Sequence, residues 1–452
     1  MYISRSDAHR AQKSRRRRKI RTLLTLNLVM LLIIAGLVGV YVFKFQGNPL
    51  EAEAGNDRSS VQTQEHLVIE EPSDGVKSDA REDADTVDPA AGKTESDHPS
   101  DGQVGDEGVE QAGSGPDVEP AEEVKAQVVM PDQDGIKLSF VGDIQMSGKI
   151  AELISKNGDD YPFHYVKSMF EQDDLTVANL ETPITTGGTP AEDKQFVFKS
   201  APSSAGALGK AGIDMVTLAN NHVLDHGVSG LMDTIKHLDA AGIRYFGAGK
   251  DEDEAFKITY VECKGKRIAL LGFSRVLPKT SWFAKGKNPG VAETYNSAMA
   301  HAKIAEARKE ADFVIVTVHW GIEKADKPNA VQKQLAREYV DAGADLIIGS
   351  HPHVLQGFEQ YKGKWIAYSL GNFVFTRSSN PMTWETAVLQ VTLNRDGSCA
   401  LQMFPFHANL GQAVPMDQAT GSKLLKRIST LSHSLGAEVR QDGRIGTIGR
   451  TR

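Results

Sequence analysis

Residues 312–321 read "DFVIVTVHWG", an apolar run that ends at a histidine and a tryptophan. Uninterrupted apolar runs are typical of strands buried on both faces of a sheet. A helix-like stretch follows at residues 330–343, and residues 344–353 return to an apolar run, "ADLIIGSHPH". Strand, helix and strand in this order predict a right-handed crossover between two parallel strands.

The same alternation extends outward along the chain. Strand-like runs occupy residues 136–144, 175–184 and 266–273 and begin the segment 213–227, while helix-like stretches occupy residues 227–242 and 296–311. The pattern predicts a layered α/β domain. Two further runs, residues 364–375 and 384–394, follow without helices between them, and we expect them to form a second, more antiparallel sheet.

The net charge of −8 over 452 residues averages three different parts. Residues 1–50 carry about +9, residues 51–130 carry about −17, and the remainder is close to neutral. A neutral domain without a basic face argues against a nucleic-acid partner. The two cysteines, Cys263 and Cys399, can pair at most once or remain free thiols.

The amino-terminal part predicts a membrane anchor. Residues 22–43 carry no charge, and as a helix they would extend about 33 Å, enough for the hydrocarbon core. The basic residues 15–19 and Arg21 precede this run, so we expect residues 1–21 to be cytoplasmic and the main domain to be extracytoplasmic. A cleaved signal peptide, with a small-residue motif at residues 52–54, is the alternative, although the apolar run exceeds a usual signal core.

Domain boundaries follow from these changes in composition. Residues 44–130 are acidic and poor in aromatic side chains, so they predict a disordered linker between the single-pass membrane helix and the domain. We expect the folded domain to occupy residues 136–410, followed by a C-terminal helix and polar tail at residues 411–452.

Polar side chains recur where the predicted strands end. Because ligand sites of open α/β sheets form beyond the carboxyl ends of strands, these side chains are candidates for one site. Each alone has a simpler interpretation as a helix cap or a buried histidine. Together, carboxylates, carboxamides and imidazoles are the ligand mixture that divalent transition metals take. The set is Asp143, Asn179, Glu181, Asn220, Asn221, His222, His319, His351, His353 and Asn372.

These strand ends carry a resemblance. The segments "FVGDIQMSG", "VANLETPIT", "LANNHVLDHG", "VHWGIE", "GSHPHVLQG" and "SLGNFVF" resemble the successive motifs of the CapA family, capsule-synthesis proteins associated with bacterial poly-γ-glutamate. The match covers about residues 136–406. That family is similar to calcineurin-like metallophosphoesterases, so the resemblance implies a four-layer αββα sandwich.

The resemblance also implies roles for individual residues. One or two divalent ions (Mn, Fe or Zn) would be held by Asp143, Glu181, Asn221, His319, His351 and His353. His222 would act as the catalytic acid with Asp225. From their positions beside these residues in the sequence, we expect Gln145, Asn179, Asn220, Glu323 and Asn372 to contact substrate or to orient ligands. Three positions depart from the phosphoesterase pattern, namely Gln145 in place of a histidine, Asn179-Leu180-Glu181 in place of a bridging Gly-Asp, and Ser350 before the two histidines.

Three functions are compatible with these residues, and whether the protein is an enzyme stays open. The first is a membrane-anchored protein in capsular poly-γ-glutamate biosynthesis or export, beside membrane-bound polyglutamate synthase subunits and the polymer. The second is an active metal-dependent hydrolase of a phosphoester or a γ-glutamyl bond. The third is a non-catalytic module that binds the polymer or acts as a scaffold.

Overall fold

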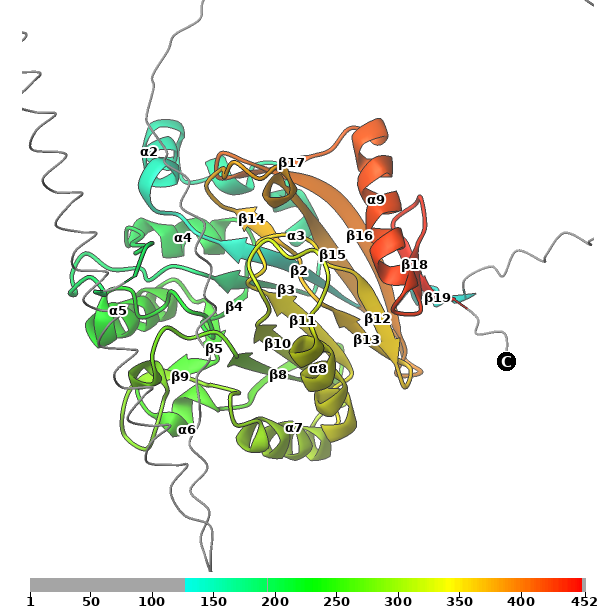
Figure 1. Ribbon diagram of the computed structural model, residues 1–452, viewed down its shortest axis with the longest axis horizontal. Helices are drawn as coiled ribbons and strands as arrows, with labels where there is room; N and C mark the ends of the chain where they lie inside the picture. The colour runs from blue at the N-terminus through cyan, green and yellow to red at the C-terminus, as the bar shows by residue number, and fades with distance from the viewer. Residues whose placement is uncertain (1–126, 193, 449–452) are drawn as a thin grey trace, which may run out of the picture. The chain divides into compact units, whose positions relative to one another are not determined.

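The computed structural model describes residues 127–192 and 194–448. The expected cytoplasmic tail 1–21, the membrane helix 22–43 and nearly all of the linker 44–130 lie outside these residues. Within the described ranges, no helix is both long enough and apolar enough to cross a bilayer. The described residues form two large sheets with helices on their outer faces (Figure 1).

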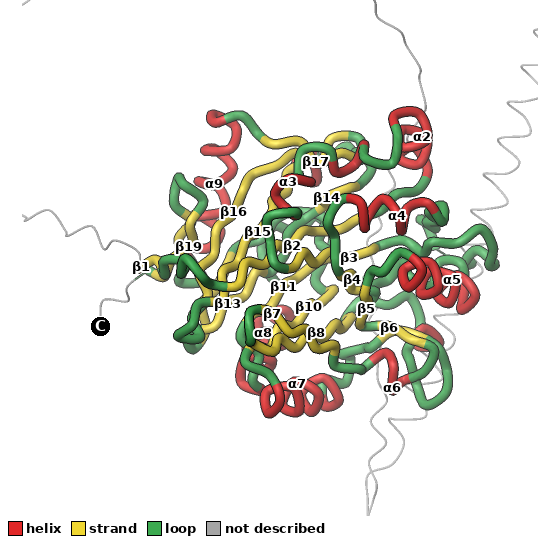
Figure 2. The backbone as a smooth tube through the Cα atoms, turned by 180° about the vertical axis from the view of Figure 1, so that it is seen from behind, coloured by secondary structure: helices red, strands yellow, loops and turns green. Residues whose placement is uncertain are grey.

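The larger sheet runs in the order β1-β19-β16-β15-β2-β3-β4-β5, and Figure 2 shows its strands side by side from behind. From β2 to β5 its strands are parallel, and from β2 to β19 they are antiparallel. Its strands are β1 (Gln127–Val128), β2 (Ile136–Ile144), β3 (Leu175–Leu180), β4 (Met215–Thr217), β5 (Arg244–Phe246), β14 (Asn372–Val374), β15 (Glu385–Leu393), β16 (Cys399–Asn409), β17 (Gln412–Pro415), β18 (Ala437–Val439) and β19 (Arg444–Thr447).

The smaller sheet contains the crossover predicted from residues 312–353. Strand β10 pairs in parallel with β11, with His319 opposite Ser350, and helix α8 connects them. Helix α8 begins at a capping box between Asn329 and Gln332 and ends at Gly343, whose φ of 122° favours glycine. The strands, in order across the sheet, are β12 (Phe358–Tyr361), β13 (Lys364–Ala367), β11 (Leu346–Ser350), β10 (Phe313–His319), β8 (Lys266–Ser274) and β7 (Thr259–Cys263).

A two-stranded sheet and the helices complete the described part. The small sheet pairs β6 (Ala248–Gly249) with β9 (Gly290–Val291). The α-helices are α2 (Gly148–Asn157), α3 (Lys167–Phe170), α4 (Ser203–Lys210), α5 (Gly227–Ala240), α6 (Glu252–Ala255), α7 (Ala298–Glu310), α8 (Ala330–Ala342) and α9 (Gln418–His433). Single 3₁₀ turns are η1 (Tyr161–Phe163), η2 (Thr280–Trp282) and η3 (Pro381–Trp384).

Alternating side chains show how the layers stack. Along β2, Leu138 and Phe140 belong to a core that β10 shares through Phe313 and Ile315, so the two sheets face each other. The opposite face of the larger sheet forms a second core with α4 and α5. The outer face of the smaller sheet forms a third core with α7 and α8. The described residues are therefore arranged as helix, sheet, sheet and helix, which confirms the expected layered α/β class (Figure 1).

Two expectations about the carboxyl-terminal half differ from the structure. The antiparallel strands after residue 364 were expected to form a separate sheet, but β15 pairs with β2 and extends the first sheet. The periodicity of apolar residues indicates which residues are buried, but it does not indicate which strand edge is free to pair. A helix was expected after residue 411 and is present as α9, but β17, β18 and β19 lie where a polar tail was expected and join the larger sheet.

Candidate metal centre

Five potential ligands meet at one edge of the two facing sheets. Asp143 lies near the end of β2, Glu181 directly follows β3, and His319 ends β10. His351 and His353 follow β11, whose last residue pairs with His319. All five side chains are buried, between 0% and 9% exposed. Both sheets deliver the carboxyl ends of parallel strands to this edge, as the position of the motifs predicted.

The ligand atoms form two overlapping groups. Asp143, Glu181 and His319 place one potential ligand atom each within 4.8 Å of one another, and so do Glu181, His351 and His353. Glu181 belongs to both groups, and a carboxylate with two oxygens is able to bridge two ions. The residues that resemblance assigned to metal are thus brought together, while their role stays a prediction.

Asn221 joins the first group. The Nε2 atom of His319 lies 3.0 Å from Oδ1 of Asn221 and 3.4 Å from Oε1 of Glu181. Two ligand atoms that each lie about 2.1 Å from one ion are separated by about 3.0 to 3.4 Å. Both distances from Nε2 of His319 therefore fit neighbouring ligands around a single ion, although the 3.0 Å contact with Asn221 equally fits a hydrogen bond.

Several buried polar atoms at this edge lack hydrogen-bond partners. Among the described residues they are both carboxylate oxygens of Glu181, Oε1 of Gln145 and Nδ1 of His351, while Oδ2 of Asp143 has an ion-pair contact of 3.2 Å with Nδ1 of His353. Burying such groups unpaired is costly unless a cation or a proton compensates them. Carboxylate, carboxamide and imidazole atoms without a thiolate fit a divalent metal such as Mn, Fe or Zn. The donor set therefore fits the metal that the resemblance implies.

The pKa shifts of the buried side chains also fit a bound divalent metal. Burial, together with the neighbouring Asp143, raises the pKa of Glu181 well above its usual value. Burial alone would lower the pKa of His353, but the two carboxyl groups of Glu181 and Asp143 raise it to about 10. Burial lowers the pKa of His319 to about 3, so this imidazole is neutral and ready to bind metal. Without an ion, a proton on His353 is the charge that offsets the carboxylates.

Hydrogen bonds from neighbouring side chains orient the ligands. The amide of Asn179 donates to Oδ1 of Asp143 at 2.8 Å, and Asn220 donates in turn to Asn179 at 3.0 Å. Oδ1 of Asn372 lies 2.9 Å from Nδ1 of His353. This contact places the proton on Nδ1 and leaves Nε2 of His353 for an ion. The structure thus puts the predicted supporting residues beside the ligands.

Ser350, one of the departures from the phosphoesterase pattern, supports a candidate ligand. Its Oγ atom lies 2.9 Å from Nδ1 of His319, which turns Nε2 of that ring toward Asn221 and Glu181. The position of Ser350 beside His319 could have been predicted from the sequence, since β10 and β11 are consecutive parallel strands that end together. The backbone strain was not foreseeable, because His351 and His353 both have positive φ, 94° and 57°.

The predicted acid and its partner form a pair beside the ligands. Nδ1 of His222 lies 2.7 Å from Oδ2 of Asp225, whose side chain is fully buried. Burial lowers the pKa of His222, although Asp225 opposes that effect. Its Nε2 atom has no hydrogen-bond partner among the described residues. Lys194, which reads in the sequence as ordinary surface charge, contacts both members of the pair.

Two predicted residues stand apart from the buried cluster. Glu323 is exposed and acts through its charge, which raises the pKa of both Glu181 and His353. Gln145 is buried, and its amide nitrogen donates to Ser147, so its unpartnered oxygen is the group left for an ion or substrate. The role of Gln145 in contacting substrate or orienting a ligand stays a prediction.

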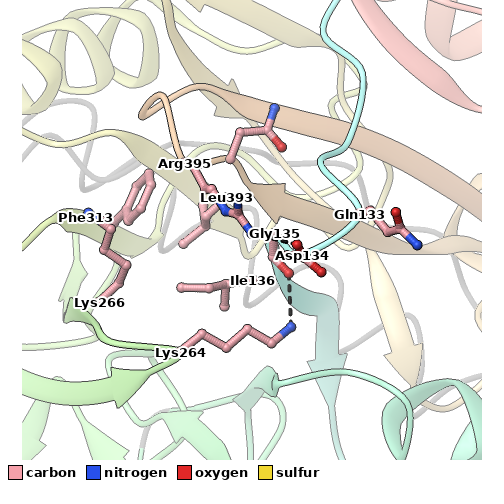
Figure 3. A pocket seen from close by; sticks show the side chains of 10 residues that line it. Gln133, Asp134, Gly135, Ile136, Lys264, Lys266, Phe313, Leu393 and Arg395 are labelled. Carbon is pink, nitrogen blue, oxygen red and sulfur yellow. Dashed lines mark hydrogen bonds and ion pairs between the residues drawn. The ribbon is translucent and has the colours of Figure 1, made fainter.

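A pocket of about 480 Å³ lies at the opposite edge of the sheets (Figure 3). Its apolar floor includes Ile136 and Phe313, the first residues of β2 and β10. Because β2 has nine residues, this pocket is about 26 Å from the metal cluster. Three cations on its rim are each paired with an acid, Lys264 with Asp174, Lys266 with Asp312, and Arg395 with Asp134.

Comparisons with known proteins place the chain in one family. Residues 137–377 match the family described as "Bacterial capsule synthesis protein PGA_cap". The chain is 34% identical over 322 residues to "Capsule biosynthesis protein CapA" of Bacillus anthracis, covering 70% of this chain and 78% of that one. It is 36% identical over 285 residues to "PGA biosynthesis protein CapA" of Bacillus subtilis, covering 63% and 74% of the two chains. The solved structure of Haemophilus influenzae NAD nucleotidase covers 63% of this chain and 60% of that one at 12% identity, with a TM-score of 0.38.

Proposed function

Because the chain belongs to the family of bacterial capsule synthesis proteins PGA_cap, we propose that it acts in the biosynthesis or export of capsular poly-γ-glutamate. We place the domain outside the cell membrane, held by a helix at residues 22–43, beside membrane-bound polyglutamate synthase subunits. The names of its relatives in two Bacillus species, together with the apolar run and its basic flank, support this assignment. We further assign the four layers to the metallophosphoesterase type.

One observation carries the functional site, namely that Glu181 is shared by two groups of candidate ligands and that neither of its buried oxygens has a hydrogen-bond partner among the described residues. A carboxylate in that environment is stabilised when it bridges cations. Asp143, Asn221 and His319 would complete one side of the site, and His351 and His353 the other. A bound divalent ion would supply an activated water and polarise a phosphoryl or acyl oxygen.

The second candidate function is hydrolysis of a phosphoester or a γ-glutamyl bond. The pairing of His222 with Asp225 favours it over a passive scaffold, because a module that only binds polymer needs no oriented imidazole beside its metal ligands. Asp225 holds Nδ1 of His222, so Nε2 is the atom that would transfer a proton to a leaving group.

The test compares wild-type protein with His353→Ala, in the full-length chain purified from membranes and in cells that lack the native copy. Elemental mass spectrometry should find one to two equivalents of divalent metal in wild type and less than half of that in the variant. Polymer output should fall in parallel. His433→Ala is the matched control, since His433 is exposed at the end of α9.

Two results would contradict the proposal. Absence of bound metal after incubation with manganese, iron and zinc would remove the metal site. Normal polymer output from a metal-depleted His353→Ala protein would separate the metal from capsule synthesis. Normal output with loss of hydrolysis of a model phosphodiester would support the second candidate alone.

A further inference from the structure

A short strap, residues 194–199, crosses the turn that carries His222. The strap has no regular secondary structure and ends where Ser200 pairs with Ile184. It comes from a different part of the chain from the turn, about 28 residues earlier. Lys194 and Phe198 face the turn, while Phe196 is 58% exposed and Lys199 is exposed. The strap therefore has an inner and an outer side.

Lys194 is an ammonium group inside the site. Its side chain is 13% exposed, and its Nζ atom contacts the backbone oxygen of Asn221 and a carboxylate oxygen of Asp225. The same atom lies 2.9 Å from Nδ1 of His222 and 5.2 Å from the centre of the Trp282 ring. Burial lowers the pKa of Lys194, and Asp225 offsets part of that cost. A buried cation with this many partners is held in one position.

Phe198 packs against one face of the His222 ring. The two rings stack with centroids 4.3 Å apart and planes 25° apart. The backbone N–H of Phe198 also donates to Oδ2 of Asp225 at 2.7 Å. Phe198 then meets Phe375 edge-on at 5.9 Å, and Phe375 lies 4.9 Å from the ring of His353. A chain of rings thus joins His222 to a predicted metal ligand.

These contacts satisfy Asp225 completely. One carboxylate oxygen contacts Lys194, and the other accepts from Phe198 and from His222. Its backbone oxygen accepts from the N–H of Ala191 at 2.8 Å. With Asp225 immobile and one ring face covered, His222 has a single orientation. In that orientation Nε2 has no hydrogen-bond partner among the described residues and is open to a reacting group.

We propose that the strap 194–199 is the positioning element of His222, in which Phe198 holds the imidazole directly and Lys194 holds its partner Asp225, so that Nε2 points toward a substrate at the metal ligands. Neither residue contacts the side chain of a predicted ligand. Phe198 contacts His222 and Asp225 directly, whereas the charge of Lys194 also acts on Glu181 and contributes to lowering its pKa. This inference rests on the proposed function, because it assumes that His222 takes part in it.

The test uses paired substitutions in the full-length protein. Phe198→Leu removes the stacked ring and Phe198→Tyr keeps it. Phe196→Leu makes the same change at a ring that lies 6.5 Å from the ring of Phe198 and is 58% exposed. Polymer output in cells should fall about tenfold for Phe198→Leu, since misplacing a proton donor loses part of its effect. It should stay near wild type for the other two. Metal content should be unchanged in all three.

Lys194→Met should lower output by a similar factor, with Lys199→Met as the matched control on the exposed side. Because Lys194→Met leaves Asp225 unpaired and is able to impair folding, Phe198→Leu is the decisive variant. Positioning through His222 makes one further prediction, which is that Phe198→Leu causes no additional loss in a His222→Ala background.

The outcomes separate this inference from the proposed function. If His222→Ala lowers output and Phe198→Leu does not, the strap has no positioning role. If Phe198→Leu lowers metal content, or lowers output further in the His222→Ala background, the strap acts by another route and the inference is overturned. If His222→Ala leaves output unchanged, the assignment of His222 within the proposed function fails, and the inference fails with it.

Discussion

The two edges of the facing sheets differ in how their charges are balanced. At the amino edge, Lys264, Lys266 and Arg395 each have an acidic partner, and the floor of the pocket is apolar. At the carboxyl edge, both oxygens of the buried Glu181 lack a hydrogen-bond partner among the described residues, and the groups within ion-pair distance of Glu181 and Asp143 are the imidazoles of His319 and His353. The same strands run between these edges. Their difference indicates that fixed side-chain charges balance the amino edge, whereas a proton on His353 or a bound cation balances the carboxyl edge.

The substitution Glu181→Gln is expected to have the largest effect on metal binding at the carboxyl edge. An amide binds divalent metal poorly and is unable to bridge two ions, so metal affinity should fall at least about a hundredfold. Elemental mass spectrometry after dialysis measures it. Because burial raises the pKa of Glu181, the amide should not destabilise the metal-free protein. A lower thermal midpoint in the metal-free variant than in metal-free wild type would argue against this electrostatic interpretation.

The second-largest effect is the dependence of metal affinity on pH. The pKa of His353 is raised to about 10 without metal, so below that pH an ion must displace the proton. Metal affinity should therefore rise about tenfold for each pH unit between 6 and 8. Calorimetric titration with manganese, in two buffers of different ionisation enthalpy, measures the proton release directly. An affinity that does not depend on pH would show that His353 is already unprotonated.

A smaller effect is expected from Ser350→Ala. The variant loses the contact with Nδ1 of His319, so the ring is free to turn, and metal affinity should fall about tenfold. Ser398→Ala at the amino edge is the matched control, because its hydroxyl contacts Asp396 rather than a ligand. Equal metal affinity in the two variants would remove Ser350 from the site.

The smallest effect is expected at the amino edge itself. Lys266→Met breaks the ion pair with Asp312, both members of which are about 40% exposed. Exposed pairs contribute about 1 kcal/mol or less, so the free energy of unfolding should change little. Metal content and polymer output should match wild type. A loss of polymer output would show that the amino edge also has a function.

Part of the candidate site could be predicted from local sequence patterns. The strand at 136–144 was predicted with the bounds that β2 has, because a buried run of nine residues is distinctive. The positions of Asp143, His319 and His353 follow from the same patterns, since a residue at the carboxyl end of a parallel strand is placed by that strand. Glu181 and Asn221 are placed in the same way by β3 and β4. The motifs that resemble the CapA family are these strand ends.

Other features depended on the folded molecule. Lys194 and Phe198 lie on an irregular segment, and only the path of that segment brings them to His222. The pairing of β15 with β2, rather than with a new sheet, depended on which strand edge was left open. Cys263 and Cys399 are both free, which their spacing left undecided.

Sequence by itself therefore determined the α/β class, the main strands and the candidate ligands at their ends, because periodicity and strand-end position are local properties of the chain. Tertiary structure decided which strands share a sheet, that Glu181 is common to two ligand groups, and that a lysine from a distant loop is buried against His222. Those properties depend on distances between segments that are far apart in the chain, and no local pattern encodes such distances.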